Sequence, residues 1–271
     1  MTEPKTPPGF EDMLAPKGAN KQRDLKTFAI VPHHPGGFMN PDQLAKIAEV
    51  AKKYAKVVNV TSGQQVMLIG LEREDVAKAW EELGREPEGL LGPRCRGVRF
   101  CPGIAYCKRA TSDAIGLGTM LDKKFRGMEV PNKVKMSVAG CYLSCTAPAI
   151  RDIGVIGLAA DSYRIVVGGS GGHAPRIADL LIEGVNRHQV LEICDKMLNY
   201  FKEQAKPGER MSEFVPRVSL PQIRQDVLGP IEGLPRWPTK EEEENKVLQG
   251  PQPPMAVQTG GQTSCPMPPT N

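Results

Sequence analysis

Two cysteine motifs decide how this sequence is interpreted: CPGIAYC at residues 101–107 and AGCYLSC at residues 139–145. Thiolates grouped in fours bind zinc or an iron–sulfur cluster. Paired zinc ligands usually enclose about two to four residues, whereas the first motif encloses the five residues PGIAY. This spacing favours a cluster and leaves zinc, or unrelated cysteines, as alternatives. The candidate ligands are Cys101, Cys107, Cys141 and Cys145.

Glycine and basic residues flank both motifs. Gly103 and Gly140 stand beside the cysteines, and glycine permits the close backbone approach that a bulky inorganic group requires. Lys133 and Lys135 alternate along an expected strand, so their side chains point to the same face. Like charges on one face repel each other unless an anion lies between them. Together with the basic residues around the first cysteine pair they predict a pocket for a multiply charged anion, while a solvated basic face is the alternative for each residue alone. These residues are Arg96, Arg99, Lys108 and Arg109.

The chain before these motifs has the pattern of a small α+β unit. Strand-like runs and helical apolar spacing follow in the order β-α-β-β-α, which is typical of a ferredoxin-like fold. The strands are expected at 27–32, 56–61 and 65–71, with helices opened by Asp42 and Asp75 and the second helix ended by Gly84.

Beyond Gly92 the pattern predicts an α/β domain that carries the cysteines. The expected helices cover 111–125, 176–184 and 189–205, and the expected strands cover 133–139, 153–157 and 163–167. The predicted fold class is therefore α+β. We predict an N-terminal arm at 1–25, a ferredoxin-like half-domain at 26–90, a cysteine-bearing domain at 91–230 and a proline-rich tail at 231–271.

Composition argues against several classes of function. A net charge of +4 and 5% aromatic residues do not predict a nucleic-acid-binding surface. No apolar run is long enough to span a membrane, and the N-terminus MTEPKTPPGFEDM has no secretion-signal pattern, so we expect a cytoplasmic protein. The seven cysteines are then expected as ligands or catalytic groups rather than as disulfides.

The cysteine motifs and their flanks resemble those of the sirohaem-containing sulfite and nitrite reductases. The family pattern is Cys-x5-Cys, a long gap, and Gly-Cys-x3-Cys running into an Asp-Ile-Gly strand, here AGCYLSCTAPAIRDIGVIG. The segments RIVVGGSGGHAPRIAD and PGERMSEFVPRV are similar to segments further along the same family. The resemblance covers roughly residues 27–228 and points to the small, single-repeat members.

The resemblance implies a ferredoxin-like half-domain followed by a domain that binds sirohaem and a 4Fe–4S cluster. The four motif cysteines would bind the cluster, and Cys145 would also bridge to the sirohaem iron. Arg96, Lys133 and Lys135 would face the substrate. The tetrapyrrole would lie against Gly168, Gly169, Ser170, Gly171, Gly172 and Arg176.

The implied activity is the six-electron reduction of a small oxyanion, sulfite to sulfide or nitrite to ammonia, with electrons from a low-potential donor protein. The alternative is a non-catalytic sirohaem and iron–sulfur electron-transfer subunit of a larger redox complex. Larger family members contain two copies of this unit, whereas this chain contains one. We therefore expect a homodimer whose sites combine the cluster of one chain with the basic residues of the other.

One position departs from the family pattern. Members often carry Thr-x-Arg-Gln in the ferredoxin-like unit, where the arginine contacts the haem or the substrate. This chain has Thr61-Ser62-Gly63-Gln64. The missing cation at Gly63 weakens anion binding unless another basic residue replaces it.

Overall fold

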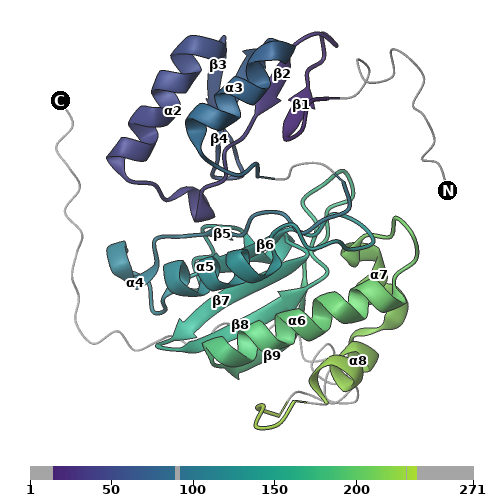
Figure 1. The fold of residues 1–271 in the computed structure, drawn as a ribbon. Helices are drawn as coiled ribbons and strands as arrows, with labels where there is room; N and C mark the ends of the chain where they lie inside the picture. The colour runs from purple at the N-terminus through teal and green to yellow at the C-terminus, as the bar shows by residue number, and fades with distance from the viewer. Residues whose placement is uncertain (1–14, 89–91, 230, 237–271) are drawn as a thin grey trace. The chain divides into compact units, whose positions relative to one another are not determined.

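The computed structural model describes residues 15–88, 92–229 and 231–236, which form two sheets with helices packed on them (Figure 1). One sheet has four strands and the other has five. No helix within these three ranges is long and apolar enough to cross a membrane. The α+β fold class predicted from the sequence is confirmed.

The first sheet is antiparallel, has the strand order β1-β2-β4-β3, and packs against two helices. Its elements are β1 (Ala19–Lys21), β2 (Phe28–Ile30), α2 (Pro41–Tyr54), β3 (Val57–Val60), β4 (Val66–Leu71) and α3 (Arg73–Leu83). The helical and strand periods of the sequence place apolar side chains such as Ile30, Val50 and Leu68 in one buried core. The order β-α-β-β-α expected from the sequence is confirmed, with β1 added before it.

Local signals in the sequence set the ends of these two helices. Asn40 caps α2 by accepting the backbone N–H of Gln43, whose side chain in turn accepts the backbone N–H of Asn40. Gly84 ends α3 in the left-handed conformation, as expected. Both helices begin one or two residues before the positions predicted from the sequence.

The N-terminal arm predicted at 1–25 is not an arm over its whole length. Strand β1 lies within it and pairs antiparallel with β2, so that Ala19 lies opposite Ile30. A strand of three residues is too short to show a period of two, and its pattern alone therefore did not reveal it. Residues 1–14 lie outside the described residues.

The second sheet is parallel on one side and antiparallel on the other. Strands β5, β6 and β7 run parallel, whereas β7, β8 and β9 are antiparallel. Helix α5 packs against β6, and α6 packs against β8 (Figure 1). The strands are β5 (Arg99–Phe100), β6 (Met136–Ala139), β7 (Ile153–Ala159), β8 (Ser162–Val167) and β9 (Asp179–Val185). The helices are α4 (Gly103–Tyr106), α5 (Ala114–Phe125), α6 (Arg187–Gln204), α7 (Met211–Val218) and α8 (Leu220–Ile223), with short turns η1 (Pro35–Gly37), η2 (Pro148–Ile150) and η3 (Arg224–Leu228).

The helix predicted at 176–184 is wrong, because most of this segment is strand β9. It lies at the edge of the sheet beside β8 and buries Leu181, Ile182 and Val185. A short apolar run fits a buried strand as well as a helix, and the pairing with β8 decides for the strand. Of the tail predicted at 231–271, only residues 231–236 are described.

Candidate functional site

The parallel pairing of β5 and β6 brings the two cysteine motifs to the same edge of the sheet. Phe100 at the end of β5 lies opposite Val138 of β6, so Cys101 and Gly140 leave their strands side by side. Cys101 donates its backbone N–H to the Val138 carbonyl at 3.3 Å, and its Sγ accepts the N–H of Gly140 at 3.1 Å. This hydrogen bond places the first cysteine of one motif against the glycine that opens the second cysteine pair.

Glycine allows the two motifs to touch. Gly103 has a left-handed φ of +54°, and a Cβ added to it would lie 2.6 Å from the backbone nitrogen of Ala114. A Cβ added to Gly140 would lie 3.0 Å from the Cα of Gly103. Close-packed backbone cannot accept such overlaps without moving, so a side chain at Gly140 would push the two motifs apart, and a side chain at Gly103 would push the first motif away from the chain at Ala114. From the sequence, these glycines are expected to let backbone approach an inorganic group. The close approach in the structure is of protein backbone to protein backbone, and the approach to a cluster stays a prediction.

The four motif thiols differ in exposure. Cys141 is buried, Cys101 and Cys107 are half-buried, and Cys145 is exposed. This is the arrangement that an enclosed cluster with one outward-facing ligand needs. Within the three described ranges, no three His, Cys, Asp or Glu side chains lie close enough to share a single metal ion. A cubane cluster does not need such a group, because each of its thiolates binds a different iron.

A cavity of about 330 Å³, the basic cavity, lies where the chain approaching β5 and β6 meets the turn between β3 and β4. Its cations are Arg96, Arg99, Lys133 and Lys135. The structure thus brings together the three residues predicted to face the substrate. Gly63 also lines this cavity, so the position that departs from the family pattern faces the same space as these cations.

A second cavity of about 370 Å³, the loop cavity, shares Lys133 and Lys135 with the basic cavity. It adds Arg151 and Arg210, and the glycine-rich loop at 169–172 lines it together with His173. Sequence analysis did not select these two arginines. The available signal was their place in two segments that carry the family resemblance, RDIG and PGER.

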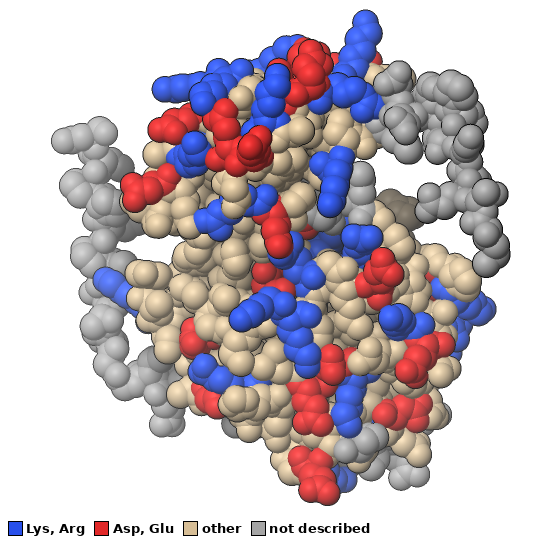
Figure 2. Space-filling view, in the orientation of Figure 1, with Lys and Arg blue, Asp and Glu red and all other residues tan. Residues whose placement is uncertain are grey.

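The cations of the two cavities are only partly neutralised. Among the described residues, the side chains of Arg99, Lys133, Lys135 and Arg151 make no hydrogen bond or ion pair. The Nε of Arg151 is buried without a hydrogen-bond acceptor. Burial lowers the pKa of Lys135, and the charges of Lys133 and Arg151 lower it further. On the face shown in Figure 2, Lys and Arg are mixed with Asp and Glu.

Arg176 supports the glycine-rich loop instead of lining the loop cavity. Its guanidinium donates to the carbonyl of Gly168 at 2.8 Å and to the carboxylate of Asp179. Its backbone also pairs with that of Ser170 in both directions at 2.9 Å. Residues 169–172 line the cavity, whereas Gly168 and Arg176 do not. The predicted contact of Arg176 with a cofactor carboxylate therefore has a competitor in Asp179.

The cations and the thiols lie at opposite ends of the same parallel strands. Arg96 and Lys135 precede β5 and β6, whereas Cys101 and Cys141 follow them. The six residues from Lys135 to Cys141 span up to about 20 Å when extended. None of the cysteines in the described ranges lines the basic cavity or the loop cavity. The thiols and the two cavities are therefore separate features of a single chain.

Comparison with known proteins identifies two matching families. The family described as "Nitrite and sulphite reductase 4Fe-4S domain" matches residues 91–232, and "Nitrite/Sulfite reductase ferredoxin-like half domain" matches residues 20–86. The chain is 36% identical over 215 residues to "Sulfite reductase, assimilatory-type" of Nitratidesulfovibrio vulgaris, covering 79% of this chain and 98% of that one. It is 39% identical to "Nitrite reductase [NAD(P)H]" of Bacillus subtilis over 78% of this chain, but spans only 26% of that relative.

Solved structures share the fold. Dissimilatory sulfite reductase I matches with a TM-score of 0.67 and 16% identity, covering 78% of this chain and 72% of that one. The Mycobacterium tuberculosis NirA protein matches with a TM-score of 0.66 and 18% identity, covering 78% and 42%. Identities this low establish the common architecture alone.

Proposed function

The chain belongs to the nitrite and sulphite reductase family, and from this premise we propose that it reduces sulfite or nitrite with the help of sirohaem and a 4Fe–4S cluster. The observation that carries the proposal is the group of cations gathered in the basic cavity and the loop cavity, four of which, Arg99, Lys133, Lys135 and Arg151, make no side-chain hydrogen bond or ion pair among the described residues. Both relatives compared above by sequence are named as reductases, which favours catalysis over the non-catalytic electron-transfer subunit.

The donor sets of the chain fit both cofactors. Cys101, Cys107, Cys141 and Cys145 supply four soft thiolates at one sheet edge, which suits a 4Fe–4S cluster. The cations of the two cavities and the backbone of the loop at 169–172 suit the carboxylates of a sirohaem. When bound, these groups would pass on to the anion the six electrons that an external donor supplies, a redox role that no side chain can fill.

The side chains of the basic cavity bind the anion and donate protons. Arg96, Lys133 and Lys135 neutralise the substrate, and the lysines hold protons within reach of it. The lowered pKa of Lys135 makes it a stronger proton donor, and a bound anion counteracts that shift. Arg99, which lines the same cavity, supplies the cation that is missing at Gly63.

The active site is shared between two copies of the chain. In one chain the cations precede β5 and β6 and the thiols follow them, so the cations beside the cluster of one chain would come from a second copy. The edge strand β3 offers a surface for a second copy: Val57, Val58 and Val60 are 57%, 49% and 78% exposed. An apolar edge strand left uncovered invites association with another chain.

Complementation tests this shared site. A Cys145→Ser chain and a Lys133→Ala/Lys135→Ala chain are each expected to be inactive as homodimers. A mixed dimer retains one site with an intact cluster ligand and intact lysines, so it should recover up to half of the wild-type activity. Mixed dimers without any recovery would show that each chain builds its site alone.

The activity itself is tested with the isolated wild-type protein. Reduced viologen is the electron source, and sulfite and nitrite are offered separately, with sulfide and ammonia measured as products. Iron and acid-labile sulfide assays count the cluster, and visible absorption reports the sirohaem. A protein that binds both cofactors but reduces neither anion would contradict the proposal. We propose a cytoplasmic location, because such a cluster is sensitive to oxygen. We also propose a low-potential donor protein as the source of the electrons.

A further inference from the structure

A buried histidine between two carboxylates connects the first sheet to the second. His33 follows β2, and its Nδ1 contacts Oε2 of Glu88 while its Nε2 lies 2.8 Å from Oδ2 of Asp122 in α5. The side chains of His33, Glu88 and Asp122 are 7%, 5% and 4% exposed. Burying charged groups lowers the stability of the fold unless they are paired and hydrogen-bonded. A buried trio of this kind therefore suggests a functional or structural role.

Backbone donors hold both carboxylates in place. Gly97 donates its N–H to Oε1 of Glu88 at 2.9 Å, and Val98 donates its N–H to Oδ1 of Asp122 at 2.9 Å. A Cβ added to Gly97 would collide with the Glu88 carboxylate. The chain that enters β5 therefore fixes the Glu88 carboxylate next to the residues of the basic cavity.

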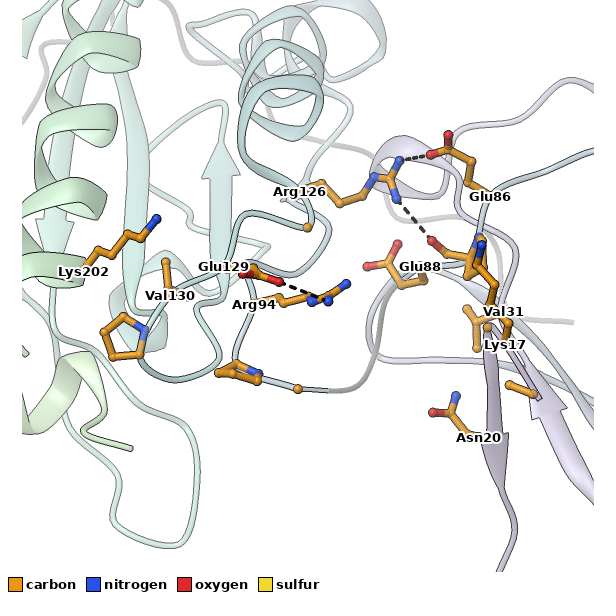
Figure 3. Close-up of a pocket in the computed structure, with 17 residues that line it drawn as sticks. Lys17, Asn20, Val31, Glu86, Glu88, Arg94, Arg126, Glu129, Val130 and Lys202 are labelled. Carbon is orange, nitrogen blue, oxygen red and sulfur yellow. Dashed lines mark hydrogen bonds and ion pairs between the residues drawn. The ribbon is translucent and has the colours of Figure 1, made fainter. Parts of the chain in front are cut away.

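Glu88 lines two cavities at once. One is the basic cavity. The other is a larger cavity of about 880 Å³ whose lining includes Glu86, Arg94, Arg126 and Lys202 (Figure 3). Glu88 is the only carboxylate of the described residues that lines the basic cavity. A titratable group in the wall between two cavities can take up a proton on one side and release it on the other.

We propose that Glu88 and His33 form a proton path that feeds the anion in the basic cavity from the larger cavity. This inference rests on the proposed reductase function. The His33 imidazolium gives its Nδ1 proton to Oε2 of Glu88, and the Glu88 carboxyl group then gives that proton to the anion or to water beside it. A proton from the larger cavity restores the pair, so no electron and no other group is consumed.

The surroundings of the pair favour a stored proton. Burial lowers the pKa of His33, but the hydrogen bonds to Asp122 and Glu88 outweigh it and raise the pKa above its ordinary value. The other charged or titratable groups that act on this trio are Glu86, His34, Arg96, Arg99 and Arg126. Each reduction of sulfite or nitrite consumes several protons, so a proton store beside the substrate has a direct use.

The test compares Glu88→Gln with Glu209→Gln. The glutamine at 88 can keep the hydrogen bond from Gly97 but cannot carry the proton. Glu209 is a matched control, because it is 8% exposed and paired with Arg217 but lines none of the cavities described above. With reduced viologen as donor, E88Q should lower kcat about 10- to 100-fold without raising KM for the anion, whereas E209Q should not change kcat.

The pH profile separates proton transfer from a structural role. Wild-type kcat should fall as the pH rises through the pKa of His33, which lies above its ordinary value of 6.5, because the His33 proton is then lost. E88Q should lose this dependence, and Glu88→Asp should restore it. A wild-type kcat that is constant between about pH 6 and pH 9 would refute the path even if no variant folded. An active wild type with an unchanged E88Q profile would refute the path alone, whereas an inactive holoprotein would refute the reductase function.

Discussion

Replacing Gly103 by alanine should displace the first cysteine motif from the chain at Ala114 and lower cluster binding. Gly103 has a φ of +54°, and an added Cβ would lie 2.6 Å from the backbone nitrogen of Ala114. Gly84 provides a matched control: its φ is +57°, but an added Cβ would meet nothing within 4 Å. The two substitutions therefore impose the same backbone strain, and only one of them adds a steric overlap.

The magnitudes follow from these two contributions. A left-handed backbone costs an alanine about 1–2 kcal/mol. Overpacking of a close-packed region costs about 1–3 kcal/mol more. We therefore expect Gly84→Ala to lower the free energy of unfolding by about 1–2 kcal/mol and Gly103→Ala to lower it by about 2–5 kcal/mol. The difference between the two variants measures the overlap with Ala114.

Two measurements on the same preparations check this prediction. Urea unfolding of the cluster-free proteins gives the stability difference. Iron and acid-labile sulfide per chain give the cluster content after reconstitution, which should fall several-fold in G103A and stay at the wild-type level in G84A. If G103A binds iron as well as G84A does, the close packing of Gly103 against Ala114 is not what positions the first cysteine pair for the cluster.

Two further predictions concern charge. Arg99→Ala should raise KM for sulfite or nitrite about 10-fold, the effect of one lost charge-assisted contact. The control variant Arg164→Ala, which breaks an exposed ion pair with Glu183, should leave KM unchanged. Equal KM values for the two variants would rule out Arg99 as the replacement for the arginine missing at Gly63. The pKa of His33 is higher in the folded protein than the ordinary value of 6.5, so protonated His33 stabilises the fold fully below pH 6.5. This stabilisation is lost as the pH rises through the raised pKa of the folded protein. Urea midpoints should therefore fall above that pH in the wild type and fall less in His33→Asn.

Local patterns in the sequence predicted most of the fold. The capped helices and alternating strands of the first sheet lie within two residues of their expected places, because each is specified by residues a few positions apart. The helix predicted at 176–184 was wrong for the opposite reason. Its apolar run has no decisive period, and its partner β8 lies on a separate stretch of the chain. Strand pairing, and not local pattern, determines such a segment.

Much of the candidate site depends on long-range contacts that no local pattern encodes. The clustering of Arg96 with Lys133 and Lys135 could be predicted from the sequence because family motifs flank these residues. The contact of His33 with Asp122 joins residues 89 positions apart, and neither side chain stands in a recognisable motif. Arg151 and Arg210 were missed for a similar reason: their role comes from the cavity that they share with the glycine-rich loop.

The unpaired cations link cofactor binding to folding. Arg99, Lys135 and Arg151 are each about half-buried, and burial lowers the pKa of each. Their mutual repulsion opposes folding of the empty chain, and an anionic cofactor that neutralises them removes that repulsion. Anions that bind only the folded chain stabilise it in proportion to the logarithm of their concentration over Kd. The same charges that recognise the substrate thus make the loaded protein more stable than the empty one.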